Sequence, residues 1–293
     1  MLIGHHQAQT QLAALLNSGR FPHAIMLHGP QGIGKRKLAG LLATRLICGP
    51  AESEAPEVDM FGAPVASTLG GGPLAFNAAS PLYAQLMAES CPDYHILQPE
   101  EGKKSIGIKQ VQGLLEVLLR SADTARTVIV DSLEDLTPEA ANTILKTLEE
   151  PRPGIYFILI AHQLSATLPT IRSRCRLCAI SPLSQPETEE VLKENKADAS
   201  LAILAAGRPG TVLGAGAKAR AEALIALQNG QKPPLTTPHF TSVVLQHLAT
   251  QPPTLAQAET YFKLSALQRD AADKNLPAAL TAEVALKKID AMK

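Results

Sequence analysis

A glycine-rich stretch near the start of the sequence constrains the fold more than any other feature. The stretch GPQGIGK, residues 29–35, follows the short apolar run AIMLH and precedes leucines at helical spacing, Leu38, Leu41, Leu42 and Leu46. A buried strand, a glycine-rich turn and a helix in this order form the setting of a phosphate-binding loop, whose backbone N–H groups surround a phosphate. The order predicts an α/β fold with a parallel sheet, and a glycine-rich turn without a ligand is the alternative interpretation.

The residue that follows Lys35 departs from the phosphate-loop pattern. In G-x-x-x-x-G-K-[ST], glycines shape the backbone around the phosphates, the lysine neutralises them, and the hydroxyl holds Mg²⁺. Gly29, Gly32 and Gly34 supply the glycines, but Arg36 stands where the hydroxyl is needed. Arginine carries only donors and stays protonated, so it cannot ligate a cation. The sequence therefore predicts a nucleotide-type site that lacks its metal ligand.

Three later apolar runs predict further strands of the same sheet, at residues 93–97, 127–131 and 155–162. The second run ends in Asp131, and the carboxyl ends of parallel strands lie beside the phosphate loop. Asp131 is thus expected where an acid holds Mg²⁺ through water. Hydrolytic enzymes of this type have a second acid at the next position to polarise the attacking water, and that residue is Ser132. Because Glu134 and Asp135 come after the strand has ended, the sequence predicts that the catalytic acid is missing as well.

Two further distinctive segments lie downstream. Thr137 followed by Pro138 predicts the start of a helix through EAANTILKTLEE, which ends before Pro151. The later segment LPTIRSRCR contains three arginines, Arg172, Arg174 and Arg176. Composition alone does not distinguish whether this arginine group is a solvated basic face or a binding site.

Composition limits the partners that the chain can bind by itself. With 293 residues and 45% hydrophobic content, it can bury a large core and form two or three domains. Its formal net charge is zero, so no overall basic field attracts nucleic acid or an anionic membrane. Aromatic residues make up 3% and tryptophan is absent, which leaves little for stacking on single-stranded bases. No apolar run reaches the roughly 20 residues of a membrane span, and we expect a cytosolic, cytoplasmic protein without a membrane partner.

The four cysteines are a poor set of zinc ligands. Cys175 and Cys178 are spaced C-x-x-C, but Cys48 and Cys91 each stand alone in the sequence. A structural zinc site needs four ligands, usually brought together as close pairs. We expect buried free thiols, with redox chemistry as the alternative, and no zinc or other metal.

The order of these segments resembles one known family. GPQGIGK, TVIVD, NTILKTLEEP and LPTIRSRCR, followed by AAGRPGTVL, are similar in sequence and spacing to the bacterial clamp-loader branch of the AAA+ ATPases. The resemblance covers roughly residues 1–215, and the remainder matches only in helical character. It implies an AAA+ P-loop domain with a parallel sheet over residues 1–180, a small helical lid over residues 181–215 and a C-terminal all-helical collar over residues 216–293. Within the first domain, residues 49–90 are rich in Ala, Pro, Gly and Ser and predict an irregular insertion.

The resemblance also implies a function. In this family the SRC segment presents an arginine finger to the nucleotide of the neighbouring subunit, a role that falls here to Arg174. Such a finger is typically worth about 10³–10⁵ in rate, because it stabilises the charge of the transferring phosphoryl group. The chain is then expected to be a DNA polymerase III clamp-loader subunit that does not hydrolyse ATP alone. It would require no cofactor and would hold ATP or ADP at most weakly, without metal, through a degenerate site of Gly29, Gly32, Gly34, Lys35 and Asp131.

The partners that the resemblance implies are other clamp-loader subunits of the gamma, tau and delta types, and through the complex the sliding clamp and primed DNA. Two alternatives remain open. A catalytically active motor subunit of the same complex would tolerate Arg36 and Ser132, and metal-dependent turnover by the isolated chain would reveal it. A small-molecule phosphotransferase would need a substrate pocket with its own acid or arginine clamp, which fits poorly with the helical segments after residue 180.

Overall fold

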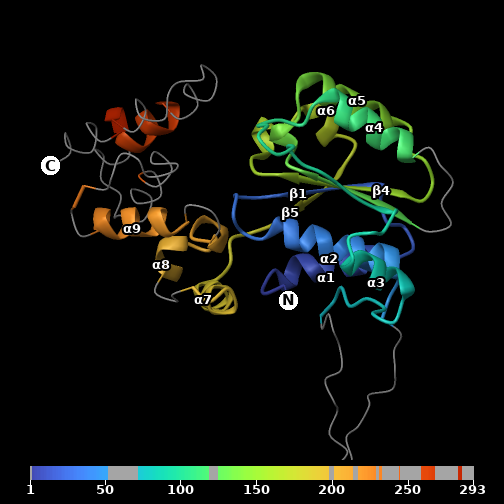
Figure 1. Cartoon of the computed structure of the whole chain (residues 1–293), viewed down its shortest axis with the longest axis horizontal. Coiled ribbons are helices and arrows are strands. Elements are labelled where there is room, and N and C mark those ends of the chain that lie inside the picture. Colours follow the sequence, from blue (N-terminus) through green and yellow to red (C-terminus); the bar gives the residue numbers. More distant parts are fainter. Residues whose placement is uncertain are drawn as a thin grey trace, which may run out of the picture. The chain divides into compact units, whose positions relative to one another are not determined.

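The structure of the chain is a computed structural model that describes residues 2–51, 72–118, 125–197, 201–213, 217–228, 231–232, 244, 259–267 and 283–285. The chain forms two compact units, Met1–Pro182 and Leu183–Lys293 (Figure 1). The first unit contains the glycine-rich loop and all of the strands that are described. It is therefore the unit that positions the candidate site.

A five-stranded parallel sheet forms the centre of the first unit. Its strands lie in the order β2-β3-β4-β1-β5. They are β1 (Ala24–His28), β2 (Tyr94–Leu97), β3 (Arg126–Asp131), β4 (Ile155–Ala161) and β5 (Arg176–Ala179). Each neighbouring pair is parallel, and β1 pairs with β4 on one side and with β5 on the other. The predicted α/β fold with a parallel sheet is confirmed.

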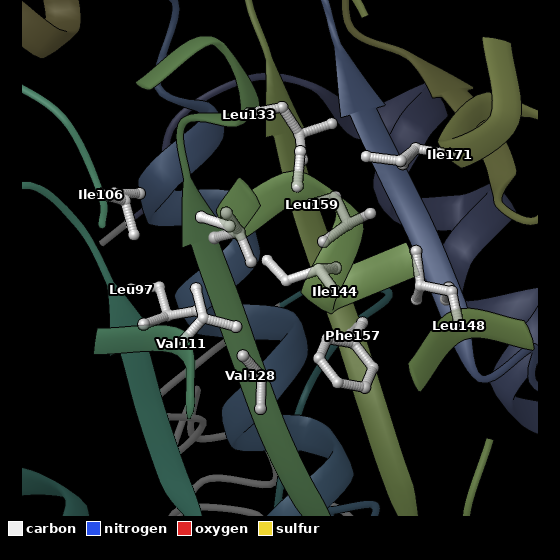
Figure 2. Close-up of a cluster of buried hydrophobic side chains, with 14 of the residues drawn as sticks. Leu97, Ile106, Val111, Val128, Leu133, Ile144, Leu148, Phe157, Leu159 and Ile171 are labelled. Atoms are coloured by element: carbon white, nitrogen blue, oxygen red, sulfur yellow. The ribbon is translucent and has the colours of Figure 1, made fainter. Parts of the chain in front are cut away.

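Helices cover both faces of this sheet, as a parallel sheet requires, because each crossover connection returns over one face. One face carries α4 (Ile108–Leu118), α5 (Pro138–Glu149) and α6 (Pro169–Arg172), and the other carries α1 (His6–Asn17) and α2 (Lys35–Cys48) (Figure 1). Successive residues of β3 alternate between the two cores. Val128 and Val130 lie in the core with α4 and α5, whereas Ile129 lies in the core with α1 and α2. Figure 2 shows the first of these cores.

Local sequence signals set the starts of the elements that frame the candidate site. Thr137 accepts a hydrogen bond from the Ala140 N–H and Pro138 occupies the first turn, so α5 begins where the sequence predicted. Helix α2 begins directly after Gly34. The short 3₁₀ helix η1 (Leu133–Asp135) follows β3, so Glu134 and Asp135 lie beyond the strand, as expected.

The expectation of an irregular segment over residues 49–90 is wrong at its C-terminal end. Helix α3 (Pro81–Met87) forms there and packs against α2, and Pro50 pairs with Phe76 in an isolated antiparallel bridge. A signal for this helix is present in the sequence, because Ser80 and Pro81 are favourable residues at a helix N-terminus. The Ala, Pro, Gly and Ser content of the whole segment conceals it. Residues 52–71 lie outside the described residues.

The described part of the second unit consists of helices and turns. Helix α7 (Gln185–Glu194) begins at a capping box between Ser184 and Glu187. Helices α8 (Leu201–Ala205) and α9 (Ala217–Gln228) follow. A small core in this unit contains Leu192, Ala202, Ala205 and Val212. Most of the predicted collar, residues 216–293, lies outside the described residues.

Among the described helices of both units, none is both long enough and apolar enough to span a bilayer.

Candidate functional site

The glycine-rich loop connects the end of β1 to the start of α2. Gly29, Gly32 and Gly34 have positive φ values of 154°, 85° and 101°. A Cβ on Gly29 would lie 2.1 Å from the carbonyl oxygen of Ile180, just after β5. This close approach of two backbone segments requires a glycine whether or not the loop binds a phosphate. Sequence reasoning assigned Gly29 to the ligand alone and missed this second requirement.

Lys35, the first residue of α2, is turned onto the loop that precedes it. Its Nζ donates hydrogen bonds to the carbonyl oxygens of Gly29 at 2.5 Å and Pro30 at 2.7 Å. The residue is only 3% exposed. Burial lowers the pKa of Lys35 to about 8, although the nearby carboxylates of Glu134 and Asp131 oppose part of this shift. Two of the three ammonium donors are therefore used by the loop itself.

Arg36, the residue that replaces the hydroxyl, forms an ion pair with the predicted metal-site acid. Its Nη1 lies 2.6 Å from Asp131 Oδ2 and also donates to Gln98 Oε1 at 3.1 Å. The side chains of Arg36 and Asp131 are 39% and 24% exposed, so the pair is partly shielded from water. The guanidinium thus places a fixed positive charge against the carboxylate that would otherwise face a metal ion. Sequence analysis identified both residues but did not predict that they contact each other.

The other two acids after β3 also have partners within the fold. Asp135 Oδ2 accepts hydrogen bonds from the Ser132 N–H at 3.0 Å and the Ser132 hydroxyl at 2.7 Å, which caps η1. Glu134 Oε1 accepts from the backbone N–H groups of His162 and Gln163 at 2.6 Å and 2.9 Å. Glu134 therefore joins η1 to the chain that leaves β4. Among the described residues, each acid from Asp131 to Asp135 has a structural role.

Two histidines lie at strand ends beside Lys35. Burial lowers the pKa of His28 and of His162, and the Lys35 charge lowers both further. Nearby carboxylates oppose part of the shift at His162. The Nδ1 atom of His162 is buried without a hydrogen-bond partner among the described residues. Neutral imidazoles at these positions add no positive charge to the site at neutral pH. Sequence analysis assigned no role to either histidine, although His28 ends the strand before the loop.

Arg174 lies in the turn between α6 and β5. Its Nη2 is 2.7 Å from Glu149 Oε1, at the end of α5. Its Nη1 donates to the Thr170 carbonyl oxygen at 3.0 Å and to Ser173 Oγ at 3.2 Å. The side chain is 36% exposed, whereas the next residue, Cys175, packs against the core, where burial raises its thiol pKa to about 12. The SRC segment therefore holds its cysteine inward and its arginine at the surface.

Arg174 and the glycine-rich loop lie toward opposite ends of the sheet. Arg174 precedes β5, whereas the loop follows β1, and these parallel neighbours pair Ile25 with Arg176 and His28 with Ala179. At about 3.3 Å per residue, the paired region alone separates the two ends by roughly 10 Å. The structure thus brings together Gly29, Lys35 and Asp131 but does not bring Arg174 to them.

The cysteines are arranged as free thiols. Cys48, Cys91 and Cys178 are buried and Cys175 is half-buried. Within the described part of the chain, no group of three or more His, Cys, Asp or Glu side chains is placed to hold a metal ion. Burial raises the pKa of Cys178, which keeps that thiol protonated at neutral pH.

The parallel sheet and the glycine-rich loop together define the class of fold. The chain has the AAA+ P-loop fold. A solved structure of a DNA polymerase III gamma subunit-related protein from Thermotoga maritima matches with a TM-score of 0.52, over 94% of this chain and 97% of that chain. Sequence identity is 18%, so this likeness concerns the fold alone. The predicted AAA+ type of fold is confirmed.

Sequence comparison identifies the branch. The family model described as "DNA polymerase III, delta subunit" matches residues 78–184. The DNA polymerase III subunit delta' of Pseudomonas aeruginosa is 37% identical over 157 residues, 52% of this chain and 41% of that protein. The delta' subunit of Escherichia coli is 32% identical over 213 residues, 69% of this chain and 57% of that protein. The chain spans about half the length of the curated relatives that it matches. The chain is thus related to the delta' subunits of bacterial DNA polymerase III, which belong to the clamp-loader branch that the motifs predicted.

Proposed function

We propose that this chain is a clamp-loader subunit that does not hydrolyse ATP and that donates Arg174 to the nucleotide site of a neighbouring subunit. The observation that carries the proposed lack of ATP hydrolysis is the ion pair between Arg36 and Asp131. The partly exposed position of Arg174, remote from the loop of its own unit, supports the proposed donation of Arg174 to a neighbour. The relationship to the delta' subunits supports the assignment to a clamp loader.

The contacts of the charged side chains in the site support the proposed loss of hydrolysis. A metal ion bridging the phosphates needs an acceptor group, and the position after Lys35 offers only the donors of Arg36. The acid that would face the metal is bound to that same arginine. Glu134 and Asp135 each accept two hydrogen bonds from the fold through one carboxylate oxygen, which supports a structural rather than a catalytic role for both.

Nucleotide binding without metal would be weak. An incoming phosphate must compete for Lys35 with the carbonyl oxygens of Gly29 and Pro30, which already accept from its ammonium. The backbone of the loop still offers N–H groups, which favour an anion. We therefore infer that the protein needs no cofactor and that ATP or ADP binds loosely if present, independently of Mg²⁺.

Action in trans follows from the position of Arg174. A guanidinium stabilises a transferring phosphoryl group only when it contacts that group. Arg174 lies at the end of the sheet away from its own loop, which supports the proposal that it serves a phosphate bound by another subunit. Neighbours of the gamma, tau and delta types, the sliding clamp and primed DNA are the proposed partners. A formal net charge of zero fits a subunit that meets DNA through the complex.

The test is ATP hydrolysis by a reconstituted clamp loader that contains this chain, stimulated by clamp and primed DNA. Arg174→Ala should remove a large part of the turnover, while Arg172→Ala, an exposed arginine two residues earlier, should leave it unchanged. The isolated chain, assayed with Mg²⁺ beside the complex, should show no hydrolysis. Mg²⁺-dependent turnover by the isolated chain, together with an unchanged complex on Arg174→Ala, would instead identify an active motor subunit.

A further inference from the structure

We propose that Glu149 is a positioning residue for Arg174, which orients the guanidinium toward the neighbouring nucleotide. This inference rests on the proposed function, because it gives Arg174 the role of the finger. Glu149 lies in the NTILKTLEEP segment and Arg174 in the SRC segment, and the structure joins them through an ion pair of 2.7 Å. The ion pair thus connects two segments that are separate motifs in the sequence.

Glu149 is placed by the hydrophobic core. It is the last residue of α5, directly after Leu148, which is 2% exposed. Leu148 and Ile144 pack in the core shown in Figure 2, and the first turn of the helix is capped by Thr137. The end of α5 is therefore fixed, and the exposed carboxylate projects from a rigid element.

The turn that carries Arg174 is anchored in the same core. Ile171 of α6 is 2% exposed and belongs to the cluster that contains Leu148 (Figure 2). The Arg174 N–H donates to the Ile171 carbonyl oxygen at 3.1 Å, which sets the backbone of the turn. Both ends of the Glu149–Arg174 pair are therefore held by one packed set of side chains.

The guanidinium is held from two sides. The α6 turn accepts from Nη1 through the Thr170 carbonyl and Ser173 Oγ, whereas α5 binds Nη2 through Glu149. Contacts on two nitrogens fix the direction of a planar group that one contact alone would leave free to turn. These three interactions use three of the five N–H donors, and the remaining donors can meet phosphate oxygens.

Orientation matters more here than stability. A displacement of about 1 Å in a group that contacts the reacting atoms can cost about 10²-fold in rate. The ion pair itself is partly exposed, with side-chain exposures of 36% and 42%, and pairs of this kind contribute little to folding. Removal of the Glu149 carboxylate should therefore disturb the finger and leave the fold intact.

The experiment is a double-mutant cycle in the reconstituted clamp loader. The turnover that depends on Arg174 is defined as the difference between the wild-type complex and the Arg174→Ala complex. Glu149→Ala should reduce the rate at the served site about tenfold, so most of this Arg174-dependent turnover should disappear through kcat rather than KM. The double variant should match Arg174→Ala alone. Glu149→Gln, which keeps an acceptor oxygen at the same distance, should restore part of the loss.

Glu150→Ala is the matched control, since Glu150 is the adjacent exposed carboxylate, and it should leave turnover unchanged. Gel filtration monitors the assembly of each complex, and circular dichroism monitors the thermal unfolding of each isolated variant. If Arg174→Ala leaves turnover unchanged, the proposed function fails. If Arg174→Ala lowers turnover and Glu149→Ala does not, only the positioning role of Glu149 is overturned. The same conclusion holds if Glu149→Ala lowers turnover by the same factor in the wild-type complex and in the Arg174→Ala complex.

Discussion

Arg36 Nη1 lies 2.6 Å from Asp131 Oδ2, and this contact joins the start of α2 to the end of β3. The residue that replaces a metal-binding hydroxyl thus binds the acid that would have faced the metal. Arg36 therefore places a positive charge of the protein itself beside Asp131, where a bound metal ion would otherwise supply one. Arg36 thus neutralises Asp131 without a bound cation, which supports the proposed loss of metal binding.

Arg36→Ser is expected to make nucleotide binding depend on Mg²⁺. The change removes the cation that covers Asp131 and supplies the hydroxyl of the phosphate-loop pattern. ATP affinity measured by calorimetry should rise about tenfold when Mg²⁺ replaces EDTA, or about 1.4 kcal/mol, whereas the wild-type chain should show no such rise. Hydrolysis should remain absent, because Ser132 provides no second acid. Lys37→Ser, which removes an exposed cation from the same helix, is the control, and an equal Mg²⁺ response in that variant would contradict the role of the pair.

Lys35 should titrate with a pKa of about 8, because its ammonium is buried against the loop carbonyls. The reference value for the unfolded chain is 10.5. Between these values the unfolded chain binds a proton that the folded chain does not, so the Lys35 contribution to the free energy of unfolding increases as pH rises through this window. NMR of the methylated amines, with Lys35→Met to assign the resonance, measures the value directly. Titration of that resonance near 10.5 would show that the amine is solvated.

The sequence predicted those parts of the fold that depend on local patterns. The apolar run IYFILIA needs burial on both faces, and it forms β4 in the middle of the sheet. Thr137 and Pro138 marked the start of α5 because a helix cap is formed by adjacent residues. The pairing of Arg36 with Asp131 was not predictable in this way, since the two residues are 95 positions apart and meet only through the order of the strands. The turn of Lys35 onto its own loop likewise depends on the three-dimensional course of the backbone.

The buried ion pair between Asp93 and Arg126 should be a strong determinant of stability. Arg126 Nε lies 2.9 Å from Asp93 Oδ1, and the two side chains are only 9% and 10% exposed. Asp93→Ala would leave a buried guanidinium without this partner, and such changes cost about 3–5 kcal/mol. Urea unfolding measures the loss. Glu100→Ala breaks the exposed pair with Lys103 and should cost less than about 1 kcal/mol, so equal losses in the two variants would refute the assignment.

Gly29→Ala should destabilise the first unit even when no nucleotide is present. The added Cβ would lie 2.1 Å from the Ile180 carbonyl oxygen, so the backbone after β5 or the loop itself must move. Overpacking of this kind costs about 1–3 kcal/mol, which thermal or urea unfolding of the nucleotide-free chain detects. Gly113→Ala is the matched comparison, because Gly113 lies exposed within α4 and its Cβ would meet open space. That variant should gain about 0.5–1 kcal/mol, since alanine favours a helix over glycine. A Gly29→Ala chain as stable as the wild type would mean that phosphate binding alone accounts for the glycine.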